Sequence, residues 1–144
     1  MQSPDVNVLV YAHRHDSPHH ATSRAWLEGA LAGDDALAVT EFALSGFVRI
    51  ATNRRIFREP TPLDVAFEFC EQFLNRDDVR ILRPTTRTWR LFQAACTFAR
   101  ISGGDVSDAY LAAQAMEHNV EFVTADRGFH RFPGLRVVLL SANP

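Results

Sequence analysis

The stretch from Gly103 to Phe129 constrains the fold most, because it combines a loop, a helix, a strand and a turn. Two glycines break the preceding element, and Asp105 and Asp108 then supply the short polar side chains that suit a helix start. Strong helix formers follow, and Val120–Thr124 is a β-branched and aromatic run typical of a strand. Asp126 comes just past the carboxyl end of that strand. The stretch therefore predicts a helix and a strand with acids at their boundaries.

Strands and helices alternate along the rest of the chain. Residues 6–12 fit either a strand or a helix that is capped near Asp5 or Asn7. Elsewhere, apolar runs predict strands and apolar residues at three- and four-residue spacings predict helices. The strands are expected at 36–40, 79–82, 120–124 and 135–140, and the helices at 20–31, 41–51, 63–74 and 86–100. This alternation predicts a single α/β domain, residues 1–144, with a mainly parallel sheet.

Acids recur where strands end, since Glu41 follows the strand at 36–40 as Asp126 follows the strand at 120–124. Ligands of open α/β sheets bind outside the carboxyl ends of the strands. Clustered carboxylates repel one another, and a hard cation such as Mg²⁺ removes that penalty. The plainer alternative is that Asp105 and Asp108 only cap a helix and Asp126 only starts a turn. A metal site therefore depends on acids from several strand ends meeting.

Composition excludes several classes of protein. The net charge is −2, so no global basic field indicates a nucleic acid, yet all 15 basic residues are arginines, which suit phosphate contacts and base stacking. Cys70 and Cys96 are expected to be reduced core residues. A zinc site among the four histidines between residues 13 and 20 is not favoured, because no cysteine joins them and their spacing fits no helical pair. With no secretory signal and no membrane-length apolar run, a cytoplasmic protein is expected.

Five segments in order resemble the PIN domain family, and specifically the VapC-type toxin ribonucleases. They are PDVNVLVYA at Asp5, the looser H-x-x-A-x-x-WL at His20, TEFALSGFVRIATN around Glu41, DAYLAAQAMEHN from Asp108 and TADRGFHRFPGL from Thr124. The resemblance implies a three-layer α/β/α sandwich. It also implies hydrolysis of RNA phosphodiester bonds with Mg²⁺ or Mn²⁺, and inhibition by a cognate VapB-type antitoxin.

The same resemblance implies a catalytic, metal-holding set of Asp5, Glu41, Asp108 and Asp126, with Asn7 orienting the first acid. Two departures stand out. Only four residues precede Asp5, so the first strand is expected to be short. The second acid that usually follows the last one by two residues is replaced by Gly128, so Asp126 must serve alone.

Three functions are compatible with these features. The first is a metal-dependent endoribonuclease acting on single-stranded loops of structured RNA, where bases are accessible. The second is a non-catalytic PIN module that binds RNA or a protein partner. A small-molecule phosphohydrolase is disfavoured, because the chain has no Gly-rich phosphate loop and no Asp-x-Asp nucleophile motif.

A homodimer is also expected. The family usually pairs in this way, and the helices at 41–51 and 63–74 contain more large apolar residues than one core face needs. These are Phe42, Phe47, Phe67, Phe69 and Phe73. Aromatic residues favour interfaces, so the dimer contact is predicted in this region.

Overall fold

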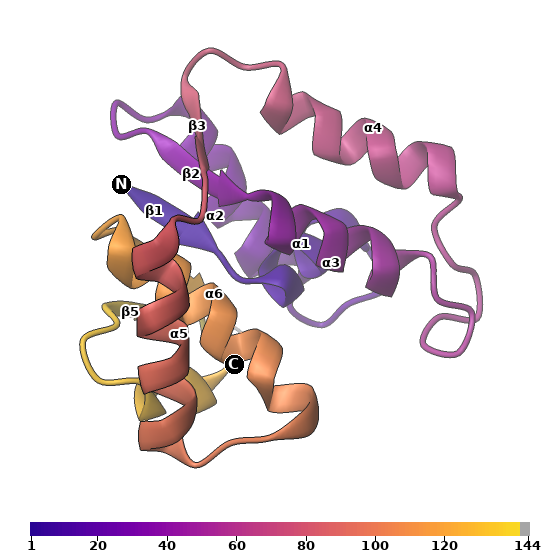
Figure 1. Ribbon diagram of the computed structural model, residues 1–144. Helices are drawn as coiled ribbons and strands as arrows, with labels where there is room; N and C mark the ends of the chain where they lie inside the picture. The colour runs from indigo at the N-terminus through magenta and orange to yellow at the C-terminus, as the bar shows by residue number, and fades with distance from the viewer. Residues whose placement is uncertain (142–144) are drawn as a thin grey trace.

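A computed structural model describes residues 1–141 of the chain, and its centre is a sheet of five parallel strands. Helices cover both faces of the sheet (Figure 1). The strands are β1 (Gln2–Pro4), β2 (Leu37–Thr40), β3 (Val79–Leu82), β4 (Glu121–Thr124) and β5 (Val137–Leu139). The helices are α1 (Val6–His13), α2 (His20–Ala32), α3 (Glu41–Ala51), α4 (Leu63–Leu74), α5 (Thr86–Ala99) and α6 (Val106–Glu117). Two 3₁₀ helices, η1 (Gly103–Asp105) and η2 (Arg127–Arg131), flank α6 and β4.

The strand order β3-β2-β1-β4-β5 puts the shortest expected strand at the centre. β1 pairs with β4 from Gln2 opposite Glu121 to Pro4 opposite Val123, and Gln2 also pairs with Leu37 of β2. The chain runs outward from β1 through β2 to β3, then crosses back to begin β4 on the other side of β1. This reversal makes the carboxyl ends of β1 and β4 the switch point of the sheet, where α/β folds bind ligands.

The segment after Asp5 is a helix, which resolves the ambiguity in the sequence. Strand and helix both suit its apolar composition, but only a helix lets Val8, Leu9 and Ala12 bury one face while the chain turns back from β1. The other helices and strands agree with the expected ranges to within one or two residues at each end. α6 ends at Glu117 with His118 as its C-cap, and the next residue, Asn119, adopts a positive φ of 52°, as an Asn stop predicts.

Three of the five aromatic residues in α3 and α4 are buried, contrary to the expectation that these residues exceed what the core needs. Phe47 and Phe73 are fully buried and Phe69 is 7% exposed, so these three belong to the core rather than to a surface surplus. Of the five aromatic residues in these two helices, Phe42 and Phe67 are the exposed ones. In the described part of the chain, no helix is both long enough and apolar enough to cross a membrane.

Candidate functional site

Asp5 stands at the switch point of the sheet. Its backbone N–H donates to the Val123 carbonyl of β4 at 2.8 Å, which fixes it beside that strand. Although it occupies the N-cap position of α1, its side chain makes no cap hydrogen bond. Instead, Asp5 Oδ2 accepts a hydrogen bond of 2.7 Å from Thr124 Oγ1, and the residue is 4% exposed. The carboxylate is therefore buried and held at the carboxyl edge of the sheet.

Thr124 connects this acid to Asp126. Its hydroxyl donates to Asp5 and accepts a 3.0 Å hydrogen bond from the Asp126 backbone N–H. Thr124 itself is fully buried at the end of β4. Thr124 is not among the functional residues expected from the sequence. The signal was the short spacing in Thr-Ala-Asp, because a hydroxyl two residues before an acid can accept from its backbone.

Asp108 and Asp126 complete the acidic cluster, and each already has a partner. Asp108, in the first turn of α6, accepts a 3.2 Å hydrogen bond from Arg131 Nη2. Asp126 Oδ1 accepts a 2.7 Å bond from the Gly128 backbone N–H. A Cβ at position 128 would lie 2.7 Å from Arg131 Nη1. The glycine that replaces the usual second acid therefore leaves room for an arginine that pairs with Asp108.

The electrostatics of the cluster disfavour full ionisation. Burial raises the pKa of Asp5 to about 6; the Thr124 hydrogen bond opposes this shift, and the charges of Asp108 and Asp126 add to it. Burial also raises the pKa of Asp108, against the lowering effect of Arg131. Both shifts follow from carboxylates that share a poorly solvated pocket.

These three aspartates line one pocket of about 290 Å³, which also includes Asn7 and Arg49. Within residues 1–141, no group of three or more His, Cys, Asp or Glu side chains is arranged to hold a metal ion as the side chains stand. The donor set nevertheless fits a hard divalent cation, because carboxylate oxygens are its preferred ligands and Asp5 is buried at a cost that a cation would relieve. Arg131 holds one oxygen of Asp108, so its guanidinium would compete with an ion for that carboxylate.

Glu41 does not join this pocket. It opens α3 after β2, as expected, but its carboxylate pairs with Arg83 at 2.8 Å, and both side chains are well exposed. It lines a neighbouring hollow instead. Glu41 therefore lies outside the lining of the pocket that the three aspartates share, beside Arg83, and its role as a fourth metal ligand stays a prediction. Asp105 is exposed and lies in η1, outside the pocket lining.

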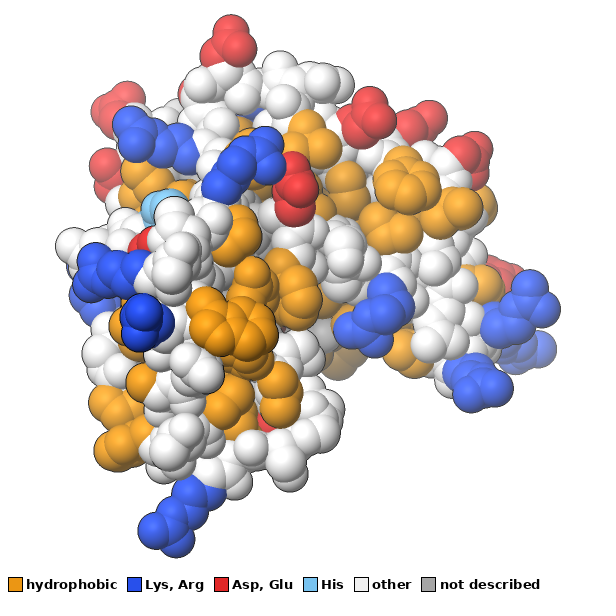
Figure 2. Space-filling model, viewed as in Figure 1, with side chains coloured by type: hydrophobic (Ala, Val, Ile, Leu, Met, Phe, Trp, Pro, Cys, Tyr) orange, Lys and Arg blue, Asp and Glu red, His pale blue; other side chains and the backbone are white. Residues whose placement is uncertain are grey.

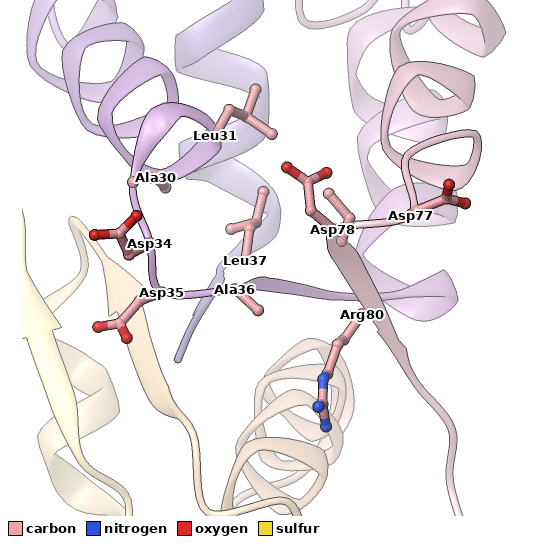
Figure 3. Close-up of a pocket in the computed structure, with 11 residues that line it drawn as sticks. Ala30, Leu31, Asp34, Asp35, Ala36, Leu37, Asp77, Asp78 and Arg80 are labelled. Atoms are coloured by element: carbon pink, nitrogen blue, oxygen red, sulfur yellow. The ribbon is translucent and has the colours of Figure 1, made fainter.

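A second group of acids lies at the opposite edge of the sheet. Asp34, Asp35, Asp77 and Asp78 line a hollow at the amino ends of β2 and β3, and in Figure 3 their carboxylates point in different directions. Asp78 is already bound by Arg76 through two hydrogen bonds, of 2.9 and 2.7 Å. This group has the character of a solvated acidic edge and not of a ligand site.

Comparisons with known proteins agree with the fold and extend over nearly the whole chain. The chain is 43% identical over 132 residues to the VapC ribonuclease Mb2897 of Mycobacterium bovis, covering 92% of this chain and 90% of that protein. It is 41% identical over 132 residues to ribonuclease VapC31 of Mycobacterium tuberculosis, covering 92% and 93%.

Among solved structures, VapBC2 of Rickettsia felis bound to a promoter DNA fragment has a TM-score of 0.71 at 19% identity, with 97% and 98% of the two chains covered. VapC20 of Mycobacterium tuberculosis, a toxin that cleaves the sarcin-ricin loop, has a TM-score of 0.67 at 13% identity, with 94% and 99% covered. At these identities the two structures support the fold alone. The family model of the PIN domain matches residues 4–135, and the chain belongs to the PIN domain family.

Proposed function

We propose that this protein is a metal-dependent endoribonuclease, the toxin of a type II toxin–antitoxin pair. The observation that carries the proposal is the pocket in which Asp5, Asp108 and Asp126 meet at the switch point of the sheet. The curated relatives support the reaction, because proteins 43% and 41% identical over nearly the full length are named ribonucleases.

The metal ligands we propose are Asp5, Asp108 and Asp126, with Mg²⁺ or Mn²⁺ as the ion. When bound, such a cation supplies a water of lowered pKa and neutralises charge on the phosphate. Asp5 gives the pocket a fixed oxygen, because Thr124 and the wall of β4 hold its carboxylate. Arg49 lines the same pocket from α3 and is exposed, so it can contact the RNA backbone. Glu41, which the sequence predicted as a fourth ligand, is assigned to the rim.

The partners we propose are a cognate antitoxin and a second copy of the chain. Several structural neighbours are toxin–antitoxin complexes, such as VapBC2 of Rickettsia felis, which supports the first. The second rests on α4, where Leu63, Phe67 and Leu74 are 57%, 50% and 45% exposed. These three residues fall on one helical stripe.

A non-catalytic PIN module remains the second candidate, and one observation favours it. Arg131 donates a hydrogen bond to Asp108, and among the described residues the three carboxylates are not arranged around an ion. The two candidates differ in whether the protein turns over RNA or only binds it.

The test is cleavage of an end-labelled, structured RNA by the purified chain. Internal cuts that require Mg²⁺ or Mn²⁺ and stop when a chelator is added are the expected result. RNA that is bound but left intact with either ion would favour the non-catalytic module and contradict the enzyme.

A further inference from the structure

A second hollow of about 270 Å³ adjoins the acidic pocket on the side of β2 and β3, and we call it the α3–α6 hollow. Its lining includes Glu41, Phe42, Arg83, Tyr110 and Gln114. Phe42 also lines the acidic pocket, so the two spaces share a wall. The volume is just below the range of about 300–1,000 Å³ typical of pockets for drug-sized ligands, which suits a single flat ring.

Gln114, which lines this hollow, has a buried amide oxygen without a hydrogen-bond partner among the described residues. The residue as a whole is 2% exposed. Buried polar atoms are nearly always paired, and an unpaired one costs free energy. The amide oxygen can therefore accept a hydrogen bond from an N–H donor that the described residues do not supply.

Aromatic rings form the wall beside that amide. Phe42 is 38% exposed and meets Tyr110 edge to face, with ring centroids 5.0 Å apart. Tyr110 in turn packs edge to face against Phe92 of α5, with ring centroids 5.3 Å apart. An exposed ring on a fixed aromatic support is a platform on which a base can stack, whatever its sequence.

One exposed arginine at the rim can contact a nucleic acid. Arg83 lines the hollow and is 68% exposed on its side chain, with Glu41 as its only ion-pair partner in the described residues. Figure 2 shows hydrophobic side chains gathered over α5 and α6 with arginines around them, whereas the exposed apolar groups over α4 lie among acids. A phosphodiester chain would therefore be attracted to the first surface rather than to the second.

We propose that the α3–α6 hollow binds the nucleobase next to the scissile phosphate of the RNA. Gln114 Oε1 accepts a hydrogen bond from an N–H group on the edge of the base, and Phe42 stacks on its face. The proposal deepens the ribonuclease function and rests on it, because a base in this hollow places the adjoining phosphate toward Asp5, Asp108 and Asp126. Such a contact gives sequence preference at one nucleotide, as RNA-binding proteins do with unpaired bases.

The experiment uses a pool of short RNAs that are randomised around the cleaved bond. Sequencing the products of the wild type should show a base preference at a nucleotide that adjoins the cut. Gln114→Met keeps the side-chain volume but removes the amide, so it should weaken that preference by about fivefold or more while the pool is still cleaved. Preferences that are identical in the two proteins would overturn the proposal, and would mean that water satisfies the amide.

Phe42→Leu provides a second variant in case Gln114→Met does not fold, and Phe98→Leu on α5 is its control because Phe98 is 68% exposed and lines neither pocket. Phe42→Leu should weaken binding of single-stranded RNA by about fivefold or more, and Phe98→Leu should not. Equal RNA binding by both, with weaker antitoxin binding by Phe42→Leu, would make the hollow a protein-docking site and contradict the proposal.

Binding of nucleoside monophosphates separates this proposal from the enzymatic one. If the wild type cleaves no RNA, the ribonuclease function fails, but AMP, CMP, GMP and UMP can still be titrated with the protein in Mg²⁺. NMR shifts of the Phe42 and Tyr110 ring signals that weaken in Gln114→Met would support the base site. No shift with any of the four nucleotides would overturn it.

Discussion

At the scale of single residues, Asp5 is the most consequential position, because its carboxylate is buried and has no ion-pair partner within residues 1–141. Burial raises its pKa from 3.8 to about 6, so the folded state binds more protons than the unfolded state between these values. The stabilising contribution of Asp5 is therefore present in full below about pH 4 and is lost as the pH rises through the folded pKa of Asp5. At neutral pH the shift corresponds to about 3 kcal/mol.

Asp5→Asn should remove this penalty in the metal-free protein. The free energies of unfolding of wild type and variant should be close near pH 4, and the variant should be more stable by up to about 3 kcal/mol at pH 8. Urea unfolding in chelator at the two pH values measures the difference. A variant that is less stable than the wild type at pH 8 would mean that the pocket does not strain this carboxylate.

Arg131 competes with a metal for Asp108, because its Nη2 lies 3.2 Å from the carboxylate. Arg131→Gln removes a positive charge beside the site, so Mn²⁺ should bind several-fold more tightly. Arg90→Gln, an exposed position on α5, is the charge-matched control and should leave the affinity unchanged. Calorimetric titration measures both, and weaker Mn²⁺ binding by Arg131→Gln would show that the arginine organises the site instead of competing for it.

At the scale of elements, α1 and the loop between α3 and α4 depend on one arginine. Arg14 Nη1 donates to the Glu59 carbonyl at 2.7 Å, and its guanidinium lies 4.0 Å from the centre of the Phe57 ring. Two further hydrogen bonds, of 2.9 and 2.6 Å, join it to Asp16. The Arg14 side chain is 11% exposed, so its guanidinium is mostly shielded from water, although its partner Asp16 is 57% exposed.

Arg14→Lys should therefore lower stability by about 1–3 kcal/mol, since a lysine cannot make the forked contacts or stack in the same way. Arg24→Lys is the control, because Arg24 makes one exposed contact with Glu28 on α2. Thermal melting compares the two, and an equal change in both variants would show that Arg14 does not fix the loop.

The elements were largely predictable from sequence, and the site only in part. Periodicity identified the helices and strands because each buries one face. The acid after the strand at 120–124 indicated Asp126, whereas Asp5 followed from the resemblance to the PIN family, and the role of both as metal ligands stays a prediction. The position of Glu41 was not predictable in this way, since a strand-end residue can face either neighbouring strand. Arg131 was missed because its approach to Asp108 depends on the space that Gly128 leaves, which no local pattern encodes.

At the scale of the whole molecule, the exposed stripe of α4 predicts self-association. Wild type should sediment as a dimer at micromolar concentration, and Phe67→Glu should shift it to monomer while the melting temperature changes little, because Phe67 is half exposed. Phe98→Glu, at a more exposed position on α5, should remain dimeric. Wild type that sediments only as a monomer would contradict this prediction.

Three aspartates, Asp5, Asp108 and Asp126, are proposed to act together in catalysis, with Glu41 outside their set. The most direct measurement is the rate of RNA cleavage by the wild type and by single variants in excess Mn²⁺, after each variant has been confirmed to be folded. Asp5→Asn, Asp108→Asn and Asp126→Asn should each lose about 100-fold or more of the rate, while Glu41→Gln should retain most of it. Wild-type rates in Asp108→Asn, or loss of activity in Glu41→Gln equal to that of the aspartate variants, would contradict the assigned site.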